Sequence, residues 1–566
     1  MRPSFAELFT PKLVTVWREG YGVADFRADV IAGLTVAVVA LPLSMAIAIA
    51  SGLPPEKGLF TAIVGGFFIS ALGGSRFQIG GPAGAFIVLV AGIVERHGYQ
   101  GLALATMMAG MLMMIAGFLR FGTYVKYIPF PVTVGFTAGI AVIIFASQIR
   151  ELLGLDLAKE PAALLPKLLA LGAALGSIKP VTVALSALAI GIILAVRRFR
   201  PHWPGMLIAV VAAAALTWFL SLSVATIGSR FGGVPSTLPL PALPVLSWAA
   251  VSAAIPDALS ITLLGAIESL LSAVVADAMS GRRHRSNCEL VAQGVANIAS
   301  VIFGGMCATG TIARTATNVR AGAHGPVSGI LHAVYILLFM LVAAPLASYI
   351  PLAALGGVLA VVAWNMAERH EFASLLTSSR GDAAVLLSTF LLTIFVDLTT
   401  AISVGVVMGA FLFLHNMAQS VEVQGLSGED QADATGEARE RYQPAARDSG
   451  VMVCRISGAF FFGATSEVAA ALERIGEHPR AFVLDFSAVP FADTSAARML
   501  AAFVARLTKS GTLVYFCAVA LPVRRALLNA GLREPGIRYV TDVDAARAEV
   551  AMALPGARLA RSDANN

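Results

Sequence analysis

Two glycine-rich stretches decide how this chain folds. They are Gln78-Ile79-Gly80-Gly81-Pro82-Ala83-Gly84-Ala85-Phe86 and Cys307-Ala308-Thr309-Gly310-Thr311-Ile312-Ala313-Arg314-Thr315. Each opens an apolar segment, at about 84–95 and about 311–318, that is too short to cross a bilayer roughly 30 Å thick. Short, glycine-interrupted segments at matching positions of two halves are typical of a transporter binding site. Glycines that only allow close helix packing are the alternative, and the matched pair favours a site.

The chemistry of such a pair favours an anion. A helix that begins inside the membrane leaves its first backbone N–H groups without partners in the helix. In hydrocarbon these donors must be satisfied, because each unsatisfied group costs several kcal/mol. Two opposed helix N-termini therefore form a positively polarised slot without any fixed charge. We expect a dehydrated small oxyanion to bind there.

The remaining sequence divides into a membrane part and a water-soluble part. Of the 566 residues, 57% are hydrophobic and only 13% are charged, whereas a soluble domain carries roughly 25% charged residues. Charged residues are scarce before His415 and common from Glu422 onward. We therefore expect a cytosolic amphipathic N-terminus at 1–28, a transmembrane anion-transport domain at 29–420, a linker at 421–450, a soluble α/β domain at 451–556 and a flexible tail at 557–566.

Apolar segments recur along the membrane part. We place fourteen of them at about 29–50, 57–73, 84–95, 100–119, 131–149, 180–196, 204–222, 255–279, 288–305, 311–318, 326–348, 351–365, 381–396 and 399–418. Short loops rich in Lys and Arg mark the cytoplasmic side. Four loops have this character, with Arg120 and Lys126; Arg197, Arg198 and Arg200; Arg282, Arg283 and Arg285; and Arg369 and Arg380. With both termini cytosolic, all four loops fall inside, and the loops at 51–56, 150–179 and 223–250 fall outside.

Several classes of protein are excluded by what the sequence lacks. Nucleic-acid binding would need a basic soluble face with base-reading or stacking groups, and no P-loop, nucleophile elbow or carboxylate pair indicates an enzyme. The cysteines, Cys288, Cys307, Cys454 and Cys517, form no CxxC pair, so we expect free thiols, no metal and no cofactor. The N-terminal residues suit an interfacial helix rather than a signal peptide.

The sequence resembles a known family, the SulP anion transporters, which include the sulfate permeases and, among animal relatives, prestin and pendrin. The resemblance rests on Asp29-Val30-Ile31-Ala32-Gly33-Leu34-Thr35-Val36 continuing to Leu41-Pro42-Leu43-Ser44-Met45-Ala46, on Gly80–Ala85 and on Ile312–Asn318. It covers almost the whole chain. Within the family, the chain looks most similar to the bacterial dicarboxylate-transporting branch, across Gly265–Leu271 and Val362–Met366.

The resemblance implies an all-α membrane domain with a gate domain and a core domain that moves in an elevator cycle. The fourteen segments would form a seven-plus-seven inverted repeat, at about 29–222 and 250–420. Two half-helices, the third and tenth segments, would hold the anion. Carried over residue by residue, the substrate-binding positions are Leu43, Ser44, Ile47, Gly84, Ala85, Phe86, Thr311, Ile312, Ala313 and Arg314. The resemblance also implies a homodimer in the bacterial inner membrane.

Glu268 is a carboxylate in an apolar run, where ionisation is costly and a functional role is the default hypothesis. A structural carboxyl, neutral or paired with Arg314, is the alternative. In sodium-coupled bicarbonate members of the family, an Asp occupies the position of Glu268 and a Thr that of Ile312. Isoleucine removes an oxygen that could coordinate sodium, and Glu268 with Ser272 alone is a poor cage. We therefore expect proton coupling through Glu268 and Ser272.

From Val451 onward, short apolar strands alternate with helices, which is typical of a compact α/β layer. Strands are expected at about 451–456, 481–486 and 512–516 and a helix at 495–508. The stretch Leu484-Asp485-Phe486-Ser487-Ala488-Val489-Pro490-Phe491-Ala492-Asp493-Thr494-Ser495-Ala496-Ala497 resembles a STAS domain, the module shared by sulfate transporters and anti-sigma antagonists. In the anti-sigma relatives the hydroxyl after the matching Asp is phosphorylated, which maps to Thr494. The alternative, which the residues favour, is that Asp493 only caps a helix.

Together these features predict a transporter rather than an enzyme. We expect a secondary active transporter that moves a C4-dicarboxylate, sulfate or bicarbonate with protons. Its expected partners are the small anion, protons, the lipid bilayer, a second copy of the chain and a cytosolic protein bound to the STAS domain. An uncoupled anion channel or exchanger of the same fold, and a membrane sensor that signals through its tail, are the alternatives.

Overall fold

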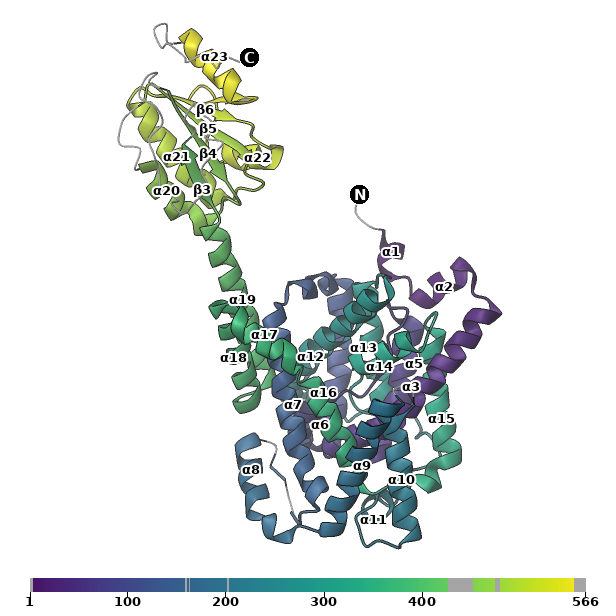
Figure 1. Cartoon of the computed structure of the whole chain (residues 1–566). Helices are drawn as coiled ribbons and strands as arrows, with labels where there is room; N and C mark the ends of the chain where they lie inside the picture. The colour runs from purple at the N-terminus through teal and green to yellow at the C-terminus, as the bar shows by residue number, and fades with distance from the viewer. Residues whose placement is uncertain are drawn as a thin grey trace. The chain divides into compact units, whose positions relative to one another are not determined.

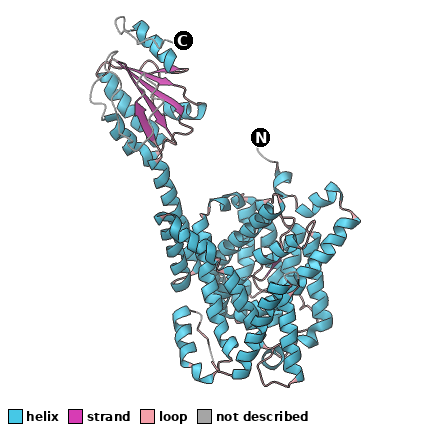
Figure 2. Cartoon of the chain, in the orientation of Figure 1, coloured by secondary structure: helices cyan, strands magenta, loops and turns pink. Residues whose placement is uncertain are grey.

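The chain divides into two units that are described separately. A computed structural model describes residues 4–157, 160–161, 163–200, 203–425, 451–473 and 479–553. The first unit runs from Met1 to Gly409 and the second from Ala410 to Asn566. Helices dominate the first unit, whereas a twisted sheet organises the second (Figures 1 and 2). The division of the sequence into an apolar part and a mixed α/β part is therefore present in the fold.

The first unit consists almost entirely of helices. In chain order they are α1 (Phe5–Phe9), α2 (Lys12–Gly20), α3 (Val23–Ala50), α4 (Pro55–Phe60), α5 (Gly66–Leu72), α6 (Ile87–Phe118), α7 (Phe130–Leu153), α8 (Leu164–Ala173), α9 (Pro180–Phe199), α10 (Gly205–Phe219), α11 (Ile227–Phe231), α12 (Trp248–Ser280), α13 (Ser286–Ile302), α14 (Ile312–Arg320), α15 (Val327–Ala347), α16 (Leu352–Met366), α17 (Arg369–Ser378), α18 (Arg380–Phe395) and α19 (Leu398–Gln419). Two strands of two residues each, β1 (Gly80–Gly81) and β2 (Thr309–Gly310), lie in the glycine-rich stretches.

Eight helical stretches within the described residues are long and apolar enough to cross a membrane. Two shorter apolar helices, α8 and α10, accompany them. The expected segments at 84–95 and 100–119 both lie in α6, which is interrupted at Gly98, where φ is 64°. Glycine adopts this left-handed conformation without a side-chain clash. The segment expected at 57–73 is divided by a π-helical turn, Thr61–Gly65.

Two expected loops contain ten-residue helices that were not predicted, and a third, at 223–250, contains the five-residue α11. The loop at 150–179 contains α8, and the basic loop between the segments at 351–365 and 381–396 contains α17. Both helices are only ten residues long. Such short segments do not show the long apolar run by which spanning helices are recognised, so composition alone did not separate them from loops.

The helices of the first unit form two packed groups. In one group α6 packs against α12 and α13, and α3 packs against α15 and α14. In the other, α7 packs against α16 and α18, and α9 packs against α16 and α10. Close approach within the first group depends on glycine: a Cβ at Gly110 of α6 would lie 2.6 Å from the carbonyl oxygen of Gly294 of α13. We call α3–α6 with α12–α15 the first helix group and α7–α10 with α16–α19 the second helix group.

The second unit is a five-stranded sheet with helices. Its elements are β3 (Glu422–Gly425), β4 (Val451–Ser457), α20 (Thr465–Glu473), β5 (Ala481–Ala488), α21 (Thr494–Lys509), β6 (Leu513–Cys517), α22 (Leu521–Asn529), β7 (Arg538–Val540) and α23 (Val543–Ala553). The strand order is β3-β4-β5-β6-β7, with β3 antiparallel and the others parallel.

The strands expected from short apolar runs correspond to β4, β5 and β6, and the expected helix corresponds to α21. Parallel strands buried on both faces appear as apolar runs, which is why they were recognisable. The linker expected at 421–450 was wrong at its start, because Glu422–Gly425 pairs with β4. Residues 426–450 and the tail at 557–566 lie outside the described residues.

Candidate functional site

The two glycine-rich stretches meet in the first unit. β1 and β2 pair antiparallel, with Gly80 opposite Gly310 and Gly81 opposite Thr309. The backbone N–H of Thr311 donates to the carbonyl oxygen of Ile79 at 3.0 Å and extends the pairing. At Gly310 a Cβ would lie 1.5 Å from the Gln78 amide nitrogen, so only glycine fits there. The two glycine-rich stretches, Gln78–Phe86 and Cys307–Thr315, therefore form one structure from two distant parts of the chain. They are called the two breaks below.

A helix begins directly after each strand, and neither start has a side-chain cap among the described residues. On one side a 3-10 turn, Gly84–Phe86, leads into α6, with Phe86 N–H donating to Ala83 O at 3.1 Å. On the other, α14 starts at Ile312, and its first helical bond runs from Thr315 N–H to Thr311 O at 3.0 Å. The N–H groups at 312–314 precede that bond. N–H groups at a helix start of this kind are donors that an anion can accept from.

Arg314 connects the two breaks. Its Nη2 donates to the carbonyl oxygen of Pro82 at 3.0 Å, although 232 positions separate the two residues. The side chain is almost completely buried, and its Nε and Nη1 have no hydrogen-bond partner. A Cβ at Gly81 would lie 2.4 Å from Nη1, so this glycine makes room for the guanidinium. A buried cation with two free donors is suited to an anionic ligand.

Glu268 lies on α12, in the helix that packs against α14. Its Oε2 is buried and has no hydrogen-bond partner. The charged group that interacts electrostatically with the Glu268 carboxyl is Arg314. The two side chains form no ion pair in the described structure. The alternative of a carboxyl paired with Arg314 is therefore not the arrangement found here, and Glu268 keeps an oxygen available for a proton.

Ser272, one turn further along α12, has a structural contact. Its hydroxyl donates to Thr315 Oγ1 at 3.0 Å, and Thr315 Oγ1 also accepts from the backbone N–H of Ile79 at 3.1 Å. Thr309 Oγ1 similarly donates to the Gly265 carbonyl oxygen at 3.3 Å. These bonds attach the paired breaks to α12. Ser272 thus holds the site together rather than pointing a free hydroxyl at a ligand.

The expected α3 residues lie beside the breaks. Leu43 and Ile47 belong to the same apolar cluster as Ala85 and Phe86, and α3 packs against α14. Ser44 is fully buried, and its Oγ has no hydrogen-bond partner. Of the ten substrate-binding positions, most are buried, Gly84 and Ile312 are half-buried and Ala313 is exposed. Packing of α3 against α14 therefore places these two predicted helices next to each other, and Ala313 is exposed.

Several buried polar residues at and beside the two glycine-rich stretches were not predicted as site residues. His332 of α15 is fully buried with neither ring nitrogen bonded, and a Cβ at Gly66 would lie 3.8 Å from its Nδ1. Gln78 Nε2 donates to Ser269 O at 3.1 Å, and Asn318 Nδ2 donates to Phe77 O at 2.9 Å. A histidine within an apolar helix is a signal that could have been used.

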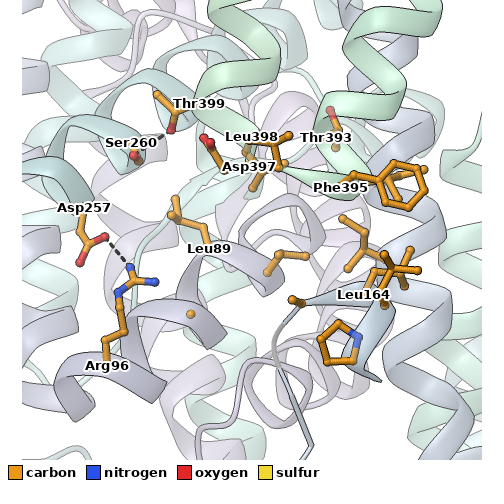
Figure 3. A pocket seen from close by; sticks show the side chains of 18 residues that line it. Leu89, Arg96, Leu164, Asp257, Ser260, Thr393, Phe395, Asp397, Leu398 and Thr399 are labelled. Atoms are coloured by element: carbon orange, nitrogen blue, oxygen red, sulfur yellow. Dashed lines mark hydrogen bonds and ion pairs between the residues drawn. The ribbon is translucent and has the colours of Figure 1, made fainter. Parts of the chain in front are cut away.

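A cavity of about 500 Å³ lies beside the start of α6 (Figure 3). Its lining residues are Val88, Leu89, Gly92, Arg96, Ile143, Ala163, Leu164, Leu165, Pro166, Asp257, Ser260, Thr393, Ile394, Phe395, Val396, Asp397, Leu398 and Thr399. None of the predicted site residues is among them. Val88 nevertheless lies only two residues after the Gly84–Phe86 turn, so the cavity reaches the start of α6.

The candidate phosphorylation site in the second unit lies at a capped helix start. Asp493 Oδ1 accepts from Ala496 N–H at 2.8 Å, and its Oδ2 accepts from Phe462 N–H at 3.0 Å. Thr494, the first residue of α21, is exposed. The capping role expected for Asp493 is confirmed. Modification of Thr494 stays a prediction.

Comparison with known proteins decides the family. Residues 26–389 match the sulfate permease family, and residues 442–545 match the STAS domain. The chain belongs to the sulfate permease family. It is therefore a multi-pass membrane transporter of anions with a C-terminal STAS domain, and it is not an enzyme.

Two bacterial relatives show how much of the chain this similarity covers. The YvdB protein of Bacillus subtilis (strain 168), which has a provisional sulfate-transporter name, is 38% identical over 518 residues, covering 91% of this chain and 95% of the relative. The bicarbonate transporter BicA of Picosynechococcus is 31% identical over 521 residues, covering 89% and 90%. These names support sulfate and bicarbonate, and they do not support the expected placement in the dicarboxylate branch.

Solved structures show the same fold. SLC26A9 matches with a TM-score of 0.82 over 96% of this chain and 93% of that one, at 18% identity. The transmembrane domain of a cyanobacterial BicA matches with a TM-score of 0.60 over 69% and 98%, at 30% identity. The expected combination of a helical membrane domain with an α/β domain is confirmed at this level.

Proposed function

We propose that this chain is a secondary active transporter that moves sulfate or bicarbonate across the inner membrane together with protons. The observation that carries the proposal is the pairing of β1 with β2, because it places two uncapped helix N-termini at one point. Their N–H groups and the free donors of Arg314 suit a small oxyanion. The names of the relatives favour sulfate and bicarbonate. A C4-dicarboxylate remains a third candidate on the sequence resemblance alone.

The mechanism that we propose is an elevator cycle. The first helix group contains both breaks, so the site would move with it as a core domain. The second helix group would be the gate. An antiparallel pair of breaks, each the third segment of seven, supports a seven-plus-seven inverted repeat. Basic loops on one side support cytosolic termini, and the homodimer rests on the resemblance alone.

Glu268 is the proposed proton carrier. An anion bound near an ionised Glu268 would put two negative charges in one dry cavity. Like charges about 4 Å apart repel by roughly 4 kcal/mol at an effective dielectric constant of about 20. That is nearly a thousandfold in affinity, so protonation of Glu268 would be linked to loading. The unpartnered Oε2 supports this role, and the Ile312 side chain offers no oxygen for sodium. Ser272 would act indirectly, by holding Thr315 and the breaks in place.

Uptake into liposomes tests the proposal. Purified full-length protein should accumulate labelled sulfate or bicarbonate when the outside is made more acidic than the lumen, and replacing sodium with potassium should change nothing. Succinate, fumarate and aspartate in the same panel test the dicarboxylate candidate. Anion flux down its own gradient that does not depend on the pH gradient would instead support the second candidate function, an uncoupled channel or exchanger of the same fold. No flux of any anion would favour a membrane sensor.

The STAS domain is the proposed regulatory part. We propose that it binds a cytosolic protein, with Thr494 as a modification site at its surface, because this residue is exposed at the start of α21. Protease added outside intact spheroplasts should leave the domain uncut if the termini are cytosolic. Cleavage of the domain under these conditions would contradict the proposed topology.

A further inference from the structure

The cavity next to α6 lies on the boundary between the two helix groups. Its walls come from α6 and α12 of the first group and from α7, α8, α18 and α19 of the second (Figure 3). Ser260 of α12 and Thr399 of α19 are joined across this boundary by a 2.8 Å hydrogen bond. In the first unit, α8 lies at the end opposite α1 and α2 (Figure 1). The cavity, which α8 helps to line, is therefore at the end of the unit opposite α1 and α2.

Three charged residues line the described part of the cavity, and two of them are carboxylates. Arg96 Nη2 donates to Asp257 Oδ1 at 2.8 Å, while its side chain stays 55% exposed. His97 Nε2 lies 3.7 Å from the other oxygen of Asp257. Asp397 accepts from the backbone N–H and the hydroxyl of Thr400, at 2.8 and 2.6 Å.

These contacts leave Arg96 as the group that can attract an incoming anion. The Asp397 charge lies at the start of α19, where the helix dipole and two hydrogen bonds compensate it. Asp257 is 11% exposed and forms the ion pair with Arg96, whose side chain is 55% exposed. Asp257 therefore orients Arg96 and also weakens its field.

One face of α6 leads from Arg96 to the candidate site. Val88, Gly92 and Arg96 are spaced four residues apart and line the cavity together, which places them on the same side of the helix. The distance along the helix from Arg96 to Val88 is about 12 Å at 1.5 Å per residue. The Gly84–Phe86 turn follows at the inner end. A small ion at Arg96 is thus about three helical turns from the uncapped N–H groups.

We propose that this cavity is the outer entrance of the anion path and that Arg96, oriented by Asp257, selects and attracts small anions there. The orientation, outside against inside, rests on the proposed function and its cytosolic termini. Arg96 is a specificity residue that acts before the anion reaches the paired breaks. Relative to a lining that lacks Arg96, an exposed cation within low-dielectric walls raises the local concentration of anions and their rate of entry.

Charge-selective labelling tests the entrance without requiring transport. A cysteine introduced by Leu89→Cys lies on the cavity wall, and the four native cysteines are buried. We expect a membrane-impermeant anionic thiosulfonate added outside to label it faster than its cationic counterpart. Adding Arg96→Gln should lower the ratio of anionic to cationic rates about three- to tenfold, and Asp257→Asn should raise it. Sulfate should slow the labelling.

The control uses a second pair of charges in an expected outer loop. Lys179 and Asp156 form an exposed ion pair at 2.7 Å, and neither residue lines the cavity. Lys179→Gln should leave the labelling ratio unchanged. If Leu89→Cys is poorly folded, Val88→Cys provides the same measurement. Absence of labelling in a folded variant, equal rates for both reagents, or equal effects of the Arg96 and Lys179 changes would overturn the proposal.

Transport provides the second measurement and separates this inference from the proposed function. At low ionic strength, Arg96→Gln should lower kcat/KM for sulfate or bicarbonate about three- to tenfold, and the difference should shrink at 0.5 M inert salt, where screening is within a few ångströms. A salt-independent effect would contradict attraction by charge. If the protein moves neither anion, the proposed function fails, while charge-selective labelling still decides the entrance.

Discussion

Two kinds of helix start exist in this molecule, and they are completed differently. In the STAS domain, α21 begins at Asp493, whose carboxylate accepts from Ala496 N–H and from Phe462 N–H. In the membrane domain, α14 and the turn that leads into α6 begin without a side-chain cap in the described structure. A helix N-terminus needs acceptors in both environments. The starts of α7, α9 and α22 also lack a side-chain cap, and the starts at α14 and α6 differ from them in lying together at the β1–β2 pair.

The difference teaches where to look for a ligand. A cap supplied by the chain satisfies the N–H groups and leaves nothing for an anion, so the Asp493 region is explained by folding alone. The uncapped starts lie beside Arg314 and Glu268, which also keep buried polar atoms without partners. Unsatisfied buried groups cost about 1–3 kcal/mol each. Several buried polar groups without partners at one point therefore indicate a place where a bound ligand supplies the missing hydrogen bonds.

Filling the space in front of the uncapped helix starts is expected to have the largest effect. Ala313→Phe or Ala85→Phe should block access of the anion to the N–H groups. Because hydrogen bonds to a charged group contribute about 1.5–3 kcal/mol each, losing two or more should lower uptake at least about 100-fold. Uptake in liposomes and expression in the membrane are measured together. The matched control is Ala215→Phe, at an exposed position of α10. Normal uptake by the Ala313 and Ala85 variants would remove the breaks as the site.

The unpartnered carboxylate gives the next largest effect. Glu268→Gln fixes a neutral side chain, so it should still exchange substrate but lose uptake driven by a pH gradient. Wild-type uptake should rise as the external pH falls, and the variant should show no such rise. Counterflow and net uptake are compared under an imposed gradient. Asp277→Asn, on the same helix but bonded to His284, should keep the pH response. A Gln variant that still accumulates substrate against its gradient would exclude Glu268 as the proton carrier.

The self-capped helix predicts a smaller effect that concerns stability alone. Asp493→Ala should destabilise α21 by about 1 kcal/mol, and Asp493→Asn should largely restore it, because Asn is also a good cap. Thr494→Ala should change stability by less than about 0.5 kcal/mol, because the side chain is exposed. Hydrogen exchange over residues 494–509 of the full-length protein measures this, with about fivefold faster exchange for the Ala variant. An equal loss at Thr494 would show that its hydroxyl is structural.

The paired carboxylate of the STAS domain gives the smallest effect and a definite pH dependence. Burial favours a raised pKa for Asp485, but the backbone N–H of Ser487 and the Arg455 side chain at 2.7 Å outweigh it, so the pKa is lowered. A lowered pKa in the folded state means that the ionised form stabilises the fold above its ordinary range. This contribution is lost as the pH falls through the lowered pKa. Asp485→Asn should therefore be less stable than wild type at pH 7, and the gap should close in acid. Thermal unfolding at both pH values measures the gap, and a gap that widens in acid would contradict the assignment.

Many helices and strands could be predicted from the sequence because their formation depends mainly on residues close together in the chain. A long apolar run predicts a helix such as α3 or α15, and short apolar runs between helical patterns predicted β4, β5 and β6. The short helices α8 and α17 were missed because ten residues do not form a recognisable spanning run. β3 was missed because its four residues have no alternation of their own and are completed only by pairing with β4.

The candidate site was predicted as a set of positions, but not as a set of contacts. The sequence singled out Gly84–Phe86, Thr311–Arg314 and Glu268, and the fold brings them together. It did not predict that Ser272 is bonded to Thr315. It also overlooked His332, whose burial follows from the packing of α15 against α3 and α5.

By itself, the sequence determined which parts of this protein enter lipid, where two helices must start inside the membrane and that the C-terminal part is an α/β domain. Each of these follows from local composition, because hydrophobicity, glycine content and capping residues act on their immediate neighbours. Only the tertiary structure decided that Gly80 and Gly310 face each other, that Arg314 reaches Pro82 and that a cavity separates Arg96 from the second helix group. These contacts join residues far apart in the chain. They exist because whole helices pack in one arrangement, which no local pattern specifies.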